Sequence, residues 1–224
     1  MSAGVLSLDP KRRTNAQAIV DAHTLGYVGD RVLDVTHNIG RFWRNHTPEL
    51  LVRCDLATGD SKGPFPIDVQ CDMTVLPFAA DSFDTTVCDP PYKLNGSGGS
   101  HASDEGYGVA DTRAADNRLG FYAGALPELI RVTRTGGHLL VKAQDQCVSA
   151  KFVRQCGDIA VAYKTAGLTE LAPLHVFGHR AQPKGKAQRN ALASFSSLLV
   201  FRVTRAAKRC VDHCPDCNKE EAFR

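Results

Sequence analysis

Four consecutive residues near the middle of the chain, Asp89, Pro90, Pro91 and Tyr92, have the side-chain types that point most directly to chemistry. They follow the β-branched run TTVC, so they stand where a buried strand is expected to end. The Asp89 carboxylate and the Pro90 carbonyl are two hydrogen-bond acceptors in a stiff stretch of backbone. Tyr92 adds a flat ring on which another planar ring can stack. These features predict a pocket that accepts both protons of an aromatic amine.

An amine attached to a nucleobase is hard to modify because its lone pair is delocalised into the ring. Two acceptors that bind both amine protons push the nitrogen toward tetrahedral geometry and free that lone pair. An aromatic platform suits a base extruded from its stack. Attack on an electrophilic methyl group then needs positioning and electrostatics more than a strong base. We therefore expect Asp89, Pro90, Pro91 and Tyr92 to be the catalytic residues, with a secondary role for Asp89 in taking the leftover proton.

Acidic residues end four consecutive predicted strands, at a spacing of roughly twenty residues: Asp34, Asp55, Asp72 and Asp89. In an open α/β sheet, ligands bind at the carboxyl ends of the strands. One or two such acids are common as turn formers or helix caps, but four in order favour a cofactor site.

The first of these acids opens the stretch LDVTHNIGRFW. The nucleotide loop of class I methyltransferases has the pattern acid-x-Gly-x-Gly-x-Gly, which places Thr36, Asn38 and Gly40 at the glycine positions behind Asp34. Asn is the non-glycine residue that best tolerates a left-handed backbone, so Asn38 is predicted to preserve the turn.

The next two acids extend the same cofactor site. Asp55 closes the second strand, where it can accept hydrogen bonds from two ribose hydroxyls. The stretch CDMTVLPFAADSFD is similar to the methyltransferase segment that holds the adenine of the cofactor. In that interpretation Asp72 accepts from the adenine amine, and the backbone N–H of Met73 donates to the ring.

These motifs together resemble the DNA amino-methyltransferases that use S-adenosyl-L-methionine and modify adenine N6 or cytosine N4. The likeness is greatest to small solitary DNA methylases of phages and actinobacteria, and it covers about residues 30–203. It is carried by VLDVTHNIGRFW, DPPY, GGHLLVKAQDQ, HVFGHRAQPKGK and the late SSLLVF. The resemblance implies a Rossmann-like class I methyltransferase fold, a seven-stranded, mainly parallel sheet with a C-terminal antiparallel hairpin.

The resemblance also implies the activity, which is methylation of adenine N6 in DNA after extrusion of the base. Asp in the first position of DPPY favours adenine, since many cytosine N4 enzymes carry Ser there. Cytosine N4 in DNA and a base amine in RNA stay open as substrates. An alternative of a different class is a non-catalytic nucleic-acid-binding protein on a degenerate methyltransferase fold. The altered glycine loop supports this alternative, and the intact DPPY argues against it. A small-molecule methyltransferase would need neither DPPY nor a basic loop.

Positive charge is concentrated in the last third of the chain. Between residues 171 and 211 there is no Asp or Glu and the net charge is +8, against +3 for the whole chain, which leaves −5 elsewhere. Such asymmetry indicates a phosphate-bearing partner, although a solvated basic surface would have the same composition. The predicted nucleic-acid contacts are Lys142, Arg180, Lys184, Lys186 and Arg189. The Gly- and Ser-rich residues 95–108 are predicted to be a mobile loop over the site.

Alternating short apolar runs and helical patterns predict the α/β architecture that would position these residues. Expected strands cover residues 31–35, 50–55, 67–72, 83–89, 137–143, 170–178 and 195–203. Expected helices cover residues 14–26, 117–134 and 148–166.

A hydrophobic fraction of 43% and a charged fraction of 23% are those of a globular protein, and no apolar run approaches the roughly 20 residues of a membrane span. With eight Cys that lack a disulfide rhythm and no signal-peptide layout at the N-terminus, we expect reduced thiols and a cytoplasmic location. The oligomeric state stays open between monomer and homodimer.

The predicted domain covers residues 1–205, and residues 206–224 are predicted to be a tail that contains Cys. Cys210, His213, Cys214 and Cys217 are soft ligands, but four of them within eight residues would strain around one zinc ion. We therefore expect no metal there and a frayed, reduced tail.

Overall fold

The computed structural model of the chain describes residues 14–60, 62–91, 118–148, 151–178 and 194–213. Its centre is a seven-stranded sheet in the order β10-β11-β7-β6-β1-β2-β5. The strands are β1 (Arg31–Asp34), β2 (Leu50–Asp55), β5 (Val69–Gln70), β6 (Phe83–Cys88), β7 (Thr133–Ala143), β10 (Thr169–Phe177) and β11 (Phe195–Arg202). Two small ribbons stand apart from it, β3 (Gly59–Asp60) with β4 (Gly63–Pro64) and β8 (Gln146–Val148) with β9 (Lys151–Val153).

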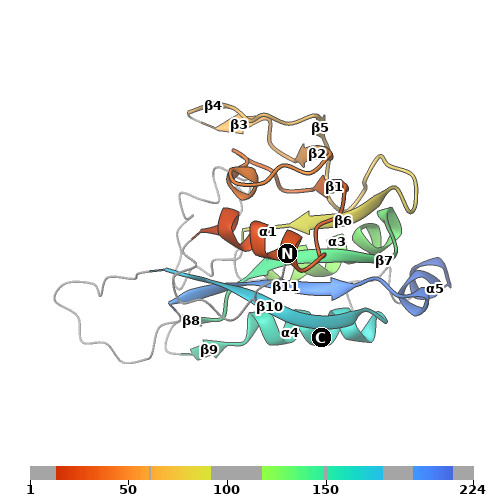
Figure 1. The fold of residues 1–224 in the computed structure, drawn as a ribbon. Coiled ribbons are helices and arrows are strands. Elements are labelled where there is room, and N and C mark those ends of the chain that lie inside the picture. The colour runs from red at the N-terminus through yellow and green to blue at the C-terminus, as the bar shows by residue number, and fades with distance from the viewer. Residues whose placement is uncertain (1–13, 61, 92–117, 149–150, 179–193, 214–224) are drawn as a thin grey trace, which may run out of the picture.

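The sheet is mainly parallel, as the sequence predicts. Strands β5, β2, β1, β6 and β7 pair in parallel, whereas β11 pairs antiparallel with both β7 and β10. The C-terminal antiparallel hairpin is therefore β10–β11, and in Figure 1 it reaches to the left of the view, past the end of β6. The predicted fold class is confirmed.

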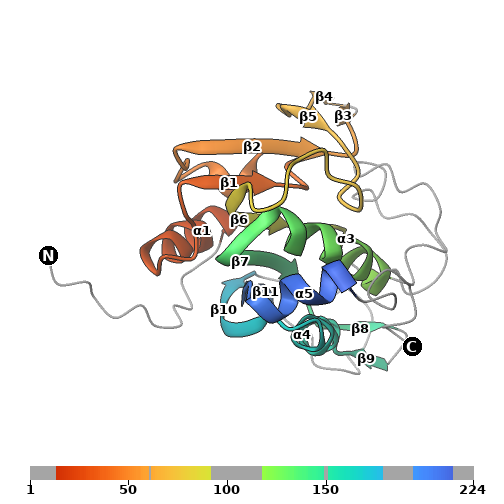
Figure 2. The same cartoon turned by 90° about the vertical axis from the view of Figure 1, so that its right-hand side faces the viewer.

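Helices cover both faces of the sheet and bury two apolar clusters (Figure 2). Helix α1 (Asn15–Thr24) packs on one face, where Ile19 and Val87 are fully buried. The other face carries α3 (Arg118–Val132), α4 (Gln155–Thr165) and α5 (Arg205–His213). Leu129 and Val141 are fully buried there. A short 3-10 helix, η1 (Arg41–Trp43), follows β1.

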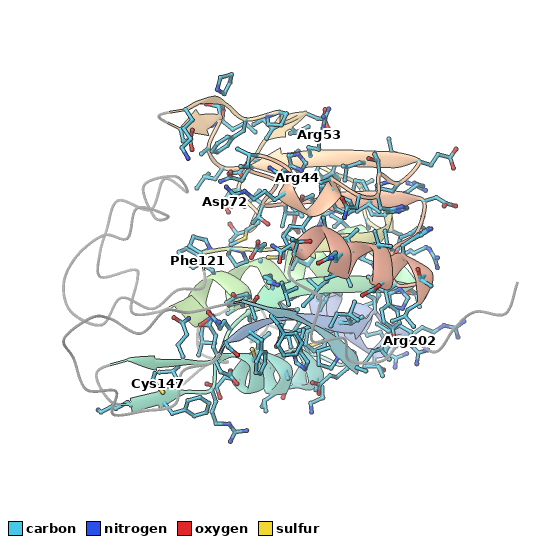
Figure 3. The ribbon with its side chains drawn as sticks, turned by 60° about the vertical axis from the view of Figure 1, so that its left-hand side comes forward. Arg44, Arg53, Asp72, Phe121, Cys147 and Arg202 are labelled. Atoms are coloured by element: carbon cyan, nitrogen blue, oxygen red, sulfur yellow. The ribbon has the colours of Figure 1, made fainter. Side chains whose placement is uncertain are left out.

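Because the parallel strands all run the same way, their carboxyl ends meet at one edge of the sheet. Figure 3 shows Asp72, Phe121 and Cys147 toward this edge and Arg202 at the opposite end. The loops that follow β1, β2 and β6 leave the sheet here, so their side chains come together although they are far apart in sequence.

Three predicted elements differ from those in the structure. The expected helix over 148–166 begins only at Gln155, because the β8–β9 ribbon precedes it and the Asp145 carboxylate accepts a 2.8 Å hydrogen bond from the Cys156 amide in its first turn. The expected strand 67–72 shrinks to Val69–Gln70, since the Asp68 side chain instead binds Arg53.

The third difference concerns the predicted tail. Residues 205–213 form helix α5, and Ala207 is fully buried in the core, so this part of the chain is not frayed. The Lys208 ammonium donates to the Arg131 carbonyl at 2.9 Å and lies 2.7 Å from an Asp81 carboxylate oxygen. Among the described residues, no helix has the length and apolar character needed to cross a membrane. Cytoplasmic location and oligomeric state stay predictions.

Candidate active site

Asp34, at the end of β1, is 2% exposed and holds the loop that follows it. Its Oδ1 accepts from the Thr36 amide at 3.2 Å, and its Oδ2 lies 3.0 Å from the His37 Nδ1. The same Oδ2 accepts from the Trp43 indole N–H at 2.7 Å. Both carboxylate oxygens are therefore hydrogen-bonded to the loop and to η1. Asp34 thus contributes to the predicted cofactor site by holding this loop in its conformation.

The loop itself turns through two left-handed residues. Asn38 has φ 49°, as the sequence predicts, and Gly40 has φ 69°. A Cβ at Gly40 would lie 2.8 Å from the His37 Nε2, which is tighter than any real contact of this kind. The backbone conformation and the buried His37 ring therefore both require glycine at this position.

Asp55, at the end of β2, lies beside this loop and is 4% exposed. Its Oδ2 accepts from the Asn38 amide at 2.8 Å, and its Oδ1 accepts from the Ala57 amide at 3.0 Å. Burial raises the pKa of the Asp55 carboxyl, and the two backbone hydrogen bonds oppose that rise. A carboxylate has about four acceptor positions. Asp55 can therefore hold the loop and still accept from a bound hydroxyl.

Asp72 and Met73 lie next to Asp55, since the Cys71 amide donates to the Asp55 carbonyl at 3.1 Å. Asp72 is exposed, and its Oδ1 accepts from the amide and the hydroxyl of Thr74, both at 2.8 Å. Met73 is half-buried, and its sulfur lies 4.0 Å from the Cys88 sulfur at the end of β6. The predicted adenine-binding pair thus borders both the Asp55 and the Asp89 regions.

Asp89 follows β6 directly and is tied to the loop after β1. Its amide donates to the Thr36 hydroxyl at 2.6 Å. Its Oδ1 atom is buried and has no hydrogen-bond partner within the described parts of the chain. Burial raises the pKa of the Asp89 carboxyl, and the charge of Lys142 opposes that rise. A buried acceptor without a partner is costly, which is typical of a position that a ligand completes.

Lys142 on β7, next to Asp89, also has a buried polar atom without a partner among the described residues. It is 1% exposed, and its Nζ forms no hydrogen bond with any described residue. Burial lowers the pKa of the Lys142 ammonium, and the charge of Asp89 opposes that change. The pairing of Cys88 on β6 with Val141 on β7 places Asp89, the residue after β6, next to Lys142 on β7. Lys142 was expected to lie beside the site and contact nucleic acid; the structure buries it beside Asp89, and the contact with nucleic acid stays a prediction.

The structure thus gathers Thr36, Asn38, Asp55, Asp89 and Lys142 along the carboxyl edge of four adjacent strands. Pro90 is buried and Pro91 half-buried directly behind Asp89. The remaining predicted site residues lie outside the described part of the chain: Tyr92, Arg180, Lys184, Lys186 and Arg189, together with the loop 95–108.

Sequence reasoning missed four side chains that support this arrangement. The Tyr122 hydroxyl donates to the Lys142 carbonyl at 2.8 Å and, at 3.4 Å, accepts from Gln155. His37 and Trp43 hold Asp34. A signal existed for Trp43, the single Trp of the chain, because a buried indole N–H needs an acceptor. Tyr122 and Gln155 have no such signal, since helix residues far apart in sequence meet only after folding.

The sequence predicts no metal site in the Cys-containing tail. Within the described residues no group of three or more His, Cys, Asp or Glu side chains could hold a metal ion. The His213 side chain, Cys214 and Cys217 lie outside the described part, so the expectation for the tail stays a prediction.

Comparison with protein-family profiles gives no match, and comparison with curated proteins gives none either. Solved structures do match. The N-methyltransferase NodS from Bradyrhizobium japonicum is 12% identical with a TM-score of 0.52, covering 84% of this chain and 94% of that chain. NodS is also known in complex with S-adenosyl-L-homocysteine. A protein from Thermoplasma acidophilum is 12% identical with a TM-score of 0.51, covering 84% of this chain and 88% of that one.

A candidate DNA modification methylase from Thermus thermophilus is 20% identical, with a TM-score of 0.41 and a coverage of 60% of this chain. The present chain covers 52% of it, about half the length of that protein. The order of strands, the antiparallel hairpin and the likeness to NodS together identify the fold as the Rossmann-like methyltransferase fold.

Proposed function

We propose that this chain is an S-adenosyl-L-methionine-dependent methyltransferase that modifies the exocyclic amine of a nucleobase, with adenine N6 in DNA as the leading substrate. The observation that carries the proposal is the pair of buried, unpartnered groups at the carboxyl edge of the sheet. The Asp89 Oδ1 lacks a donor and the Lys142 Nζ lacks an acceptor among the described residues. An amino-substituted ring with a nitrogen next to its amine can satisfy both groups at once.

The residues present fit the cofactor. The left-handed backbone at Asn38 and Gly40 keeps the loop after β1 close to the sheet, where a larger side chain would collide with His37. Asp55 has acceptor capacity left for ribose hydroxyls, and Met73 and Asp72 stand next to it for the adenine. When bound, the cofactor supplies an electrophilic methyl group on a sulfonium.

The protein's own residues then orient the acceptor amine. Asp89 accepts one amine proton through its unpartnered oxygen, and the Pro90 carbonyl is proposed to accept the other. The Lys142 ammonium donates to the ring nitrogen beside the amine, and its charge lowers the pKa of the Asp89 carboxyl. The Thr36 hydroxyl fixes the Asp89 backbone relative to the cofactor loop. Asp89 can accept the proton released after transfer, since its pKa is raised by burial.

The test is methyl transfer from labelled S-adenosyl-L-methionine to unmethylated DNA and, separately, to total RNA, with mass spectrometry of the digested nucleosides. The Asp89→Ala variant is expected to lose activity by about 10²–10⁴-fold, the usual range for a positioned acid–base group. Asp84→Asn is the matched control, because Asp84 lies on β6 at the end away from Asp89 and binds Arg134.

N6-methyladenine in DNA that disappears in Asp89→Ala supports the proposal. Label in N4-methylcytosine or in RNA alone would change the substrate and keep the chemistry. Equal activity of Asp89→Ala and wild type would refute the role of Asp89. DNA binding without cofactor binding or label would favour a non-catalytic nucleic-acid-binding protein on this fold.

A further inference from the structure

The end of the β10–β11 hairpin carries an aromatic cluster that the reaction does not use. His175 and Phe177 on β10 and Phe195 on β11 have ring centroids 4.8–6.4 Å apart. Phe177 and Phe195 are direct partners in the antiparallel register, and His175 pairs with Ser197, so the three rings share one face. Phe195 is 36% exposed, which is unusual for a large ring at the end of a core strand.

A small pocket opens at the same end of the hairpin. It has a volume of about 120 Å³ and is lined by backbone and side chains of seven residues, among them Gln144, Val176, Phe177 and Phe195. The Gln144 amide donates to the Phe195 carbonyl at 2.7 Å and so ties the hairpin to the end of β7. Pockets for whole small molecules start at roughly 300 Å³, so this one suits a single ring of a larger ligand.

The hairpin end shares its edge with Asp89. Strand β10 runs parallel to β7 because two antiparallel pairings separate them, so its carboxyl end and the start of β11 lie at the active-site edge. Strands β11 and β10 are two and three places from β6, which corresponds to roughly 10 and 15 Å across the sheet. Stacked nucleotides advance about 3.4 Å along a strand, so this distance is a few nucleotides from a base held at Asp89.

Charge indicates what kind of ligand would reach this place. Gly178 and Ser194 line the pocket and are joined by a 2.6 Å backbone hydrogen bond. The segment between them in the sequence, residues 179–193, contains four Lys or Arg and no Asp or Glu. In the sequence, these four positive charges therefore lie between Gly178 and Ser194, the two residues that flank the aromatic cluster. Aromatic rings interleaved with positive charge are the usual means of binding unpaired nucleotides.

We infer that His175, Phe177 and Phe195 form a stacking site for an unpaired nucleobase that flanks the target nucleotide. This inference rests on the proposed function and adds to it a substrate class, nucleic acid that is single-stranded or locally opened at the modified position. Phe195 presents the exposed ring face, and Phe177 and His175 support it from the neighbouring strand.

The test uses probes that the amine pocket should not select. Fluorescein-labelled oligothymidylate of about twelve residues has no exocyclic amine, and an abasic strand of the same length keeps the phosphates without the bases. Anisotropy titrations at one fixed salt concentration compare wild type with Phe195→Leu and Phe177→Leu. Phe195→Tyr keeps the ring and is the conservative control, and thermal melting of each variant checks folding.

Wild type is expected to bind oligothymidylate more tightly than the abasic strand. Loss of one stacked ring should weaken oligothymidylate binding by roughly 5- to 100-fold, with the abasic strand unchanged and Phe195→Tyr close to wild type. Binding of both leucine variants within twofold of wild type would overturn the inference. Equal affinity of wild type for oligothymidylate and for the abasic strand would also overturn it. Absence of any binding would do the same, since it would mean that the rings are not accessible to a base.

Methyl transfer is assayed in parallel so that the two proposals fail separately. Ring-dependent oligothymidylate binding without any methyl transfer leaves the stacking site standing and refutes the reaction. Methyl transfer to DNA, together with oligothymidylate binding that does not depend on the rings, would support the reaction and overturn the stacking site.

Discussion

At the scale of single residues, the carboxylates of the site differ in how they are bonded. Asp34 has both oxygens hydrogen-bonded inside the protein, whereas the Asp89 Oδ1 is buried without a partner among the described residues. The same residue type at the ends of neighbouring strands therefore has two uses. Asp34 shapes the loop, and Asp89 is kept available for a ligand at a cost in stability.

The raised pKa of Asp89 predicts how methyl transfer depends on pH. Asp89 must be ionised to accept an amine proton, and burial raises its pKa, so kcat/KM should rise as the pH increases through that raised value. The Lys142 charge lowers this pKa, so Lys142→Met should move the acidic limb of the profile to higher pH. Lys164→Met, at an exposed ion pair with Glu170, is the control. An unmoved acidic limb in Lys142→Met would contradict the coupling.

The pKa of Asp89 also affects the stability of the folded chain. A carboxyl whose pKa is higher in the folded than in the unfolded state contributes stability at low pH and loses it as the pH rises through the folded value. Asp89→Asn removes this penalty, so its gain in unfolding free energy over wild type should be larger at about pH 8 than at about pH 5. Urea denaturation at both pH values measures it. A gain that is the same at both pH values would mean that Asp89 titrates normally.

Gly40 carries a local prediction about the cofactor loop. Gly40→Ala places a Cβ in a left-handed backbone 2.8 Å from the His37 Nε2, whose ring is held by Asp34. Gly26 also has a left-handed backbone, with φ 76°, but a Cβ there would meet no atom within 4 Å. Gly26→Ala therefore measures the backbone strain without the side-chain contact. We expect about 1–2 kcal/mol of destabilisation for Gly26→Ala and about 1–3 kcal/mol more for Gly40→Ala. Urea denaturation measures both.

Calorimetry with S-adenosyl-L-methionine completes this comparison. Weaker binding should be confined to Gly40→Ala, because only that residue of the two lies in the cofactor loop. Similar stability and affinity in the two variants would show that the contact with His37 is unimportant.

At the scale of elements, the site depends on how the loop after β1 meets the end of β6. A short hydrogen bond of 2.6 Å joins them, from the Asp89 amide to the Thr36 hydroxyl. The parallel pairing of β1 with β6 brings the two segments together but does not by itself fix the angle of either loop. This hydrogen bond therefore couples the cofactor segment to the catalytic segment.

Thr36→Val tests this coupling. The change keeps the shape of the side chain and leaves the Asp89 amide without its acceptor, which should cost about 1–3 kcal/mol and lower kcat more than it raises KM. Thr36→Ser retains the hydroxyl and should restore both quantities. Steady-state methyl transfer and denaturation together measure the effect. If Thr36→Ser is as impaired as Thr36→Val, the methyl group and not the hydrogen bond matters.

At the scale of the whole molecule, α5 belongs to the folded domain. The predicted boundary after residue 205 cuts through this helix, which packs on α3 and carries the buried Ala207. Gly167 accommodates it closely, because a Cβ there would lie 2.8 Å from the Ala207 nitrogen. The contacts of Lys208 with Arg131 and Asp81 hold the same helix in place.

Two adjacent alanines of α5 provide a matched test. Ala207 is fully buried and Ala206 is exposed, so Ala207→Asp should lower the unfolding free energy by about 3 kcal/mol or more, and Ala206→Asp by about 0.5 kcal/mol or less. Chemical denaturation followed by two probes measures this. Equal small effects in both variants would place α5 outside the cooperative unit.

The sequence by itself determined the fold class, most of the central strands and the order of the strand-end acids. Alternating apolar segments of strand and helix length leave few topologies, and parallel strands bring their carboxyl ends to one edge whatever the details. Asn38 was predicted to turn left-handed because it stands at a glycine position of the methyltransferase loop pattern and Asn tolerates this backbone, and it does.

Only the tertiary structure decided how these acids are used. Lys142 was expected beside the site as a contact to nucleic acid, but only the pairing of β6 with β7 shows that it is buried next to Asp89. Tyr122 on α3 and Gln155 on α4 support the backbone of Lys142 only because these two helices meet in the folded protein. Secondary-structure propensity and hydrophobic periodicity are local properties of the sequence, so they could be predicted. Hydrogen-bond partners and burial arise from contacts between segments that are distant in the sequence, so only the folded structure shows them.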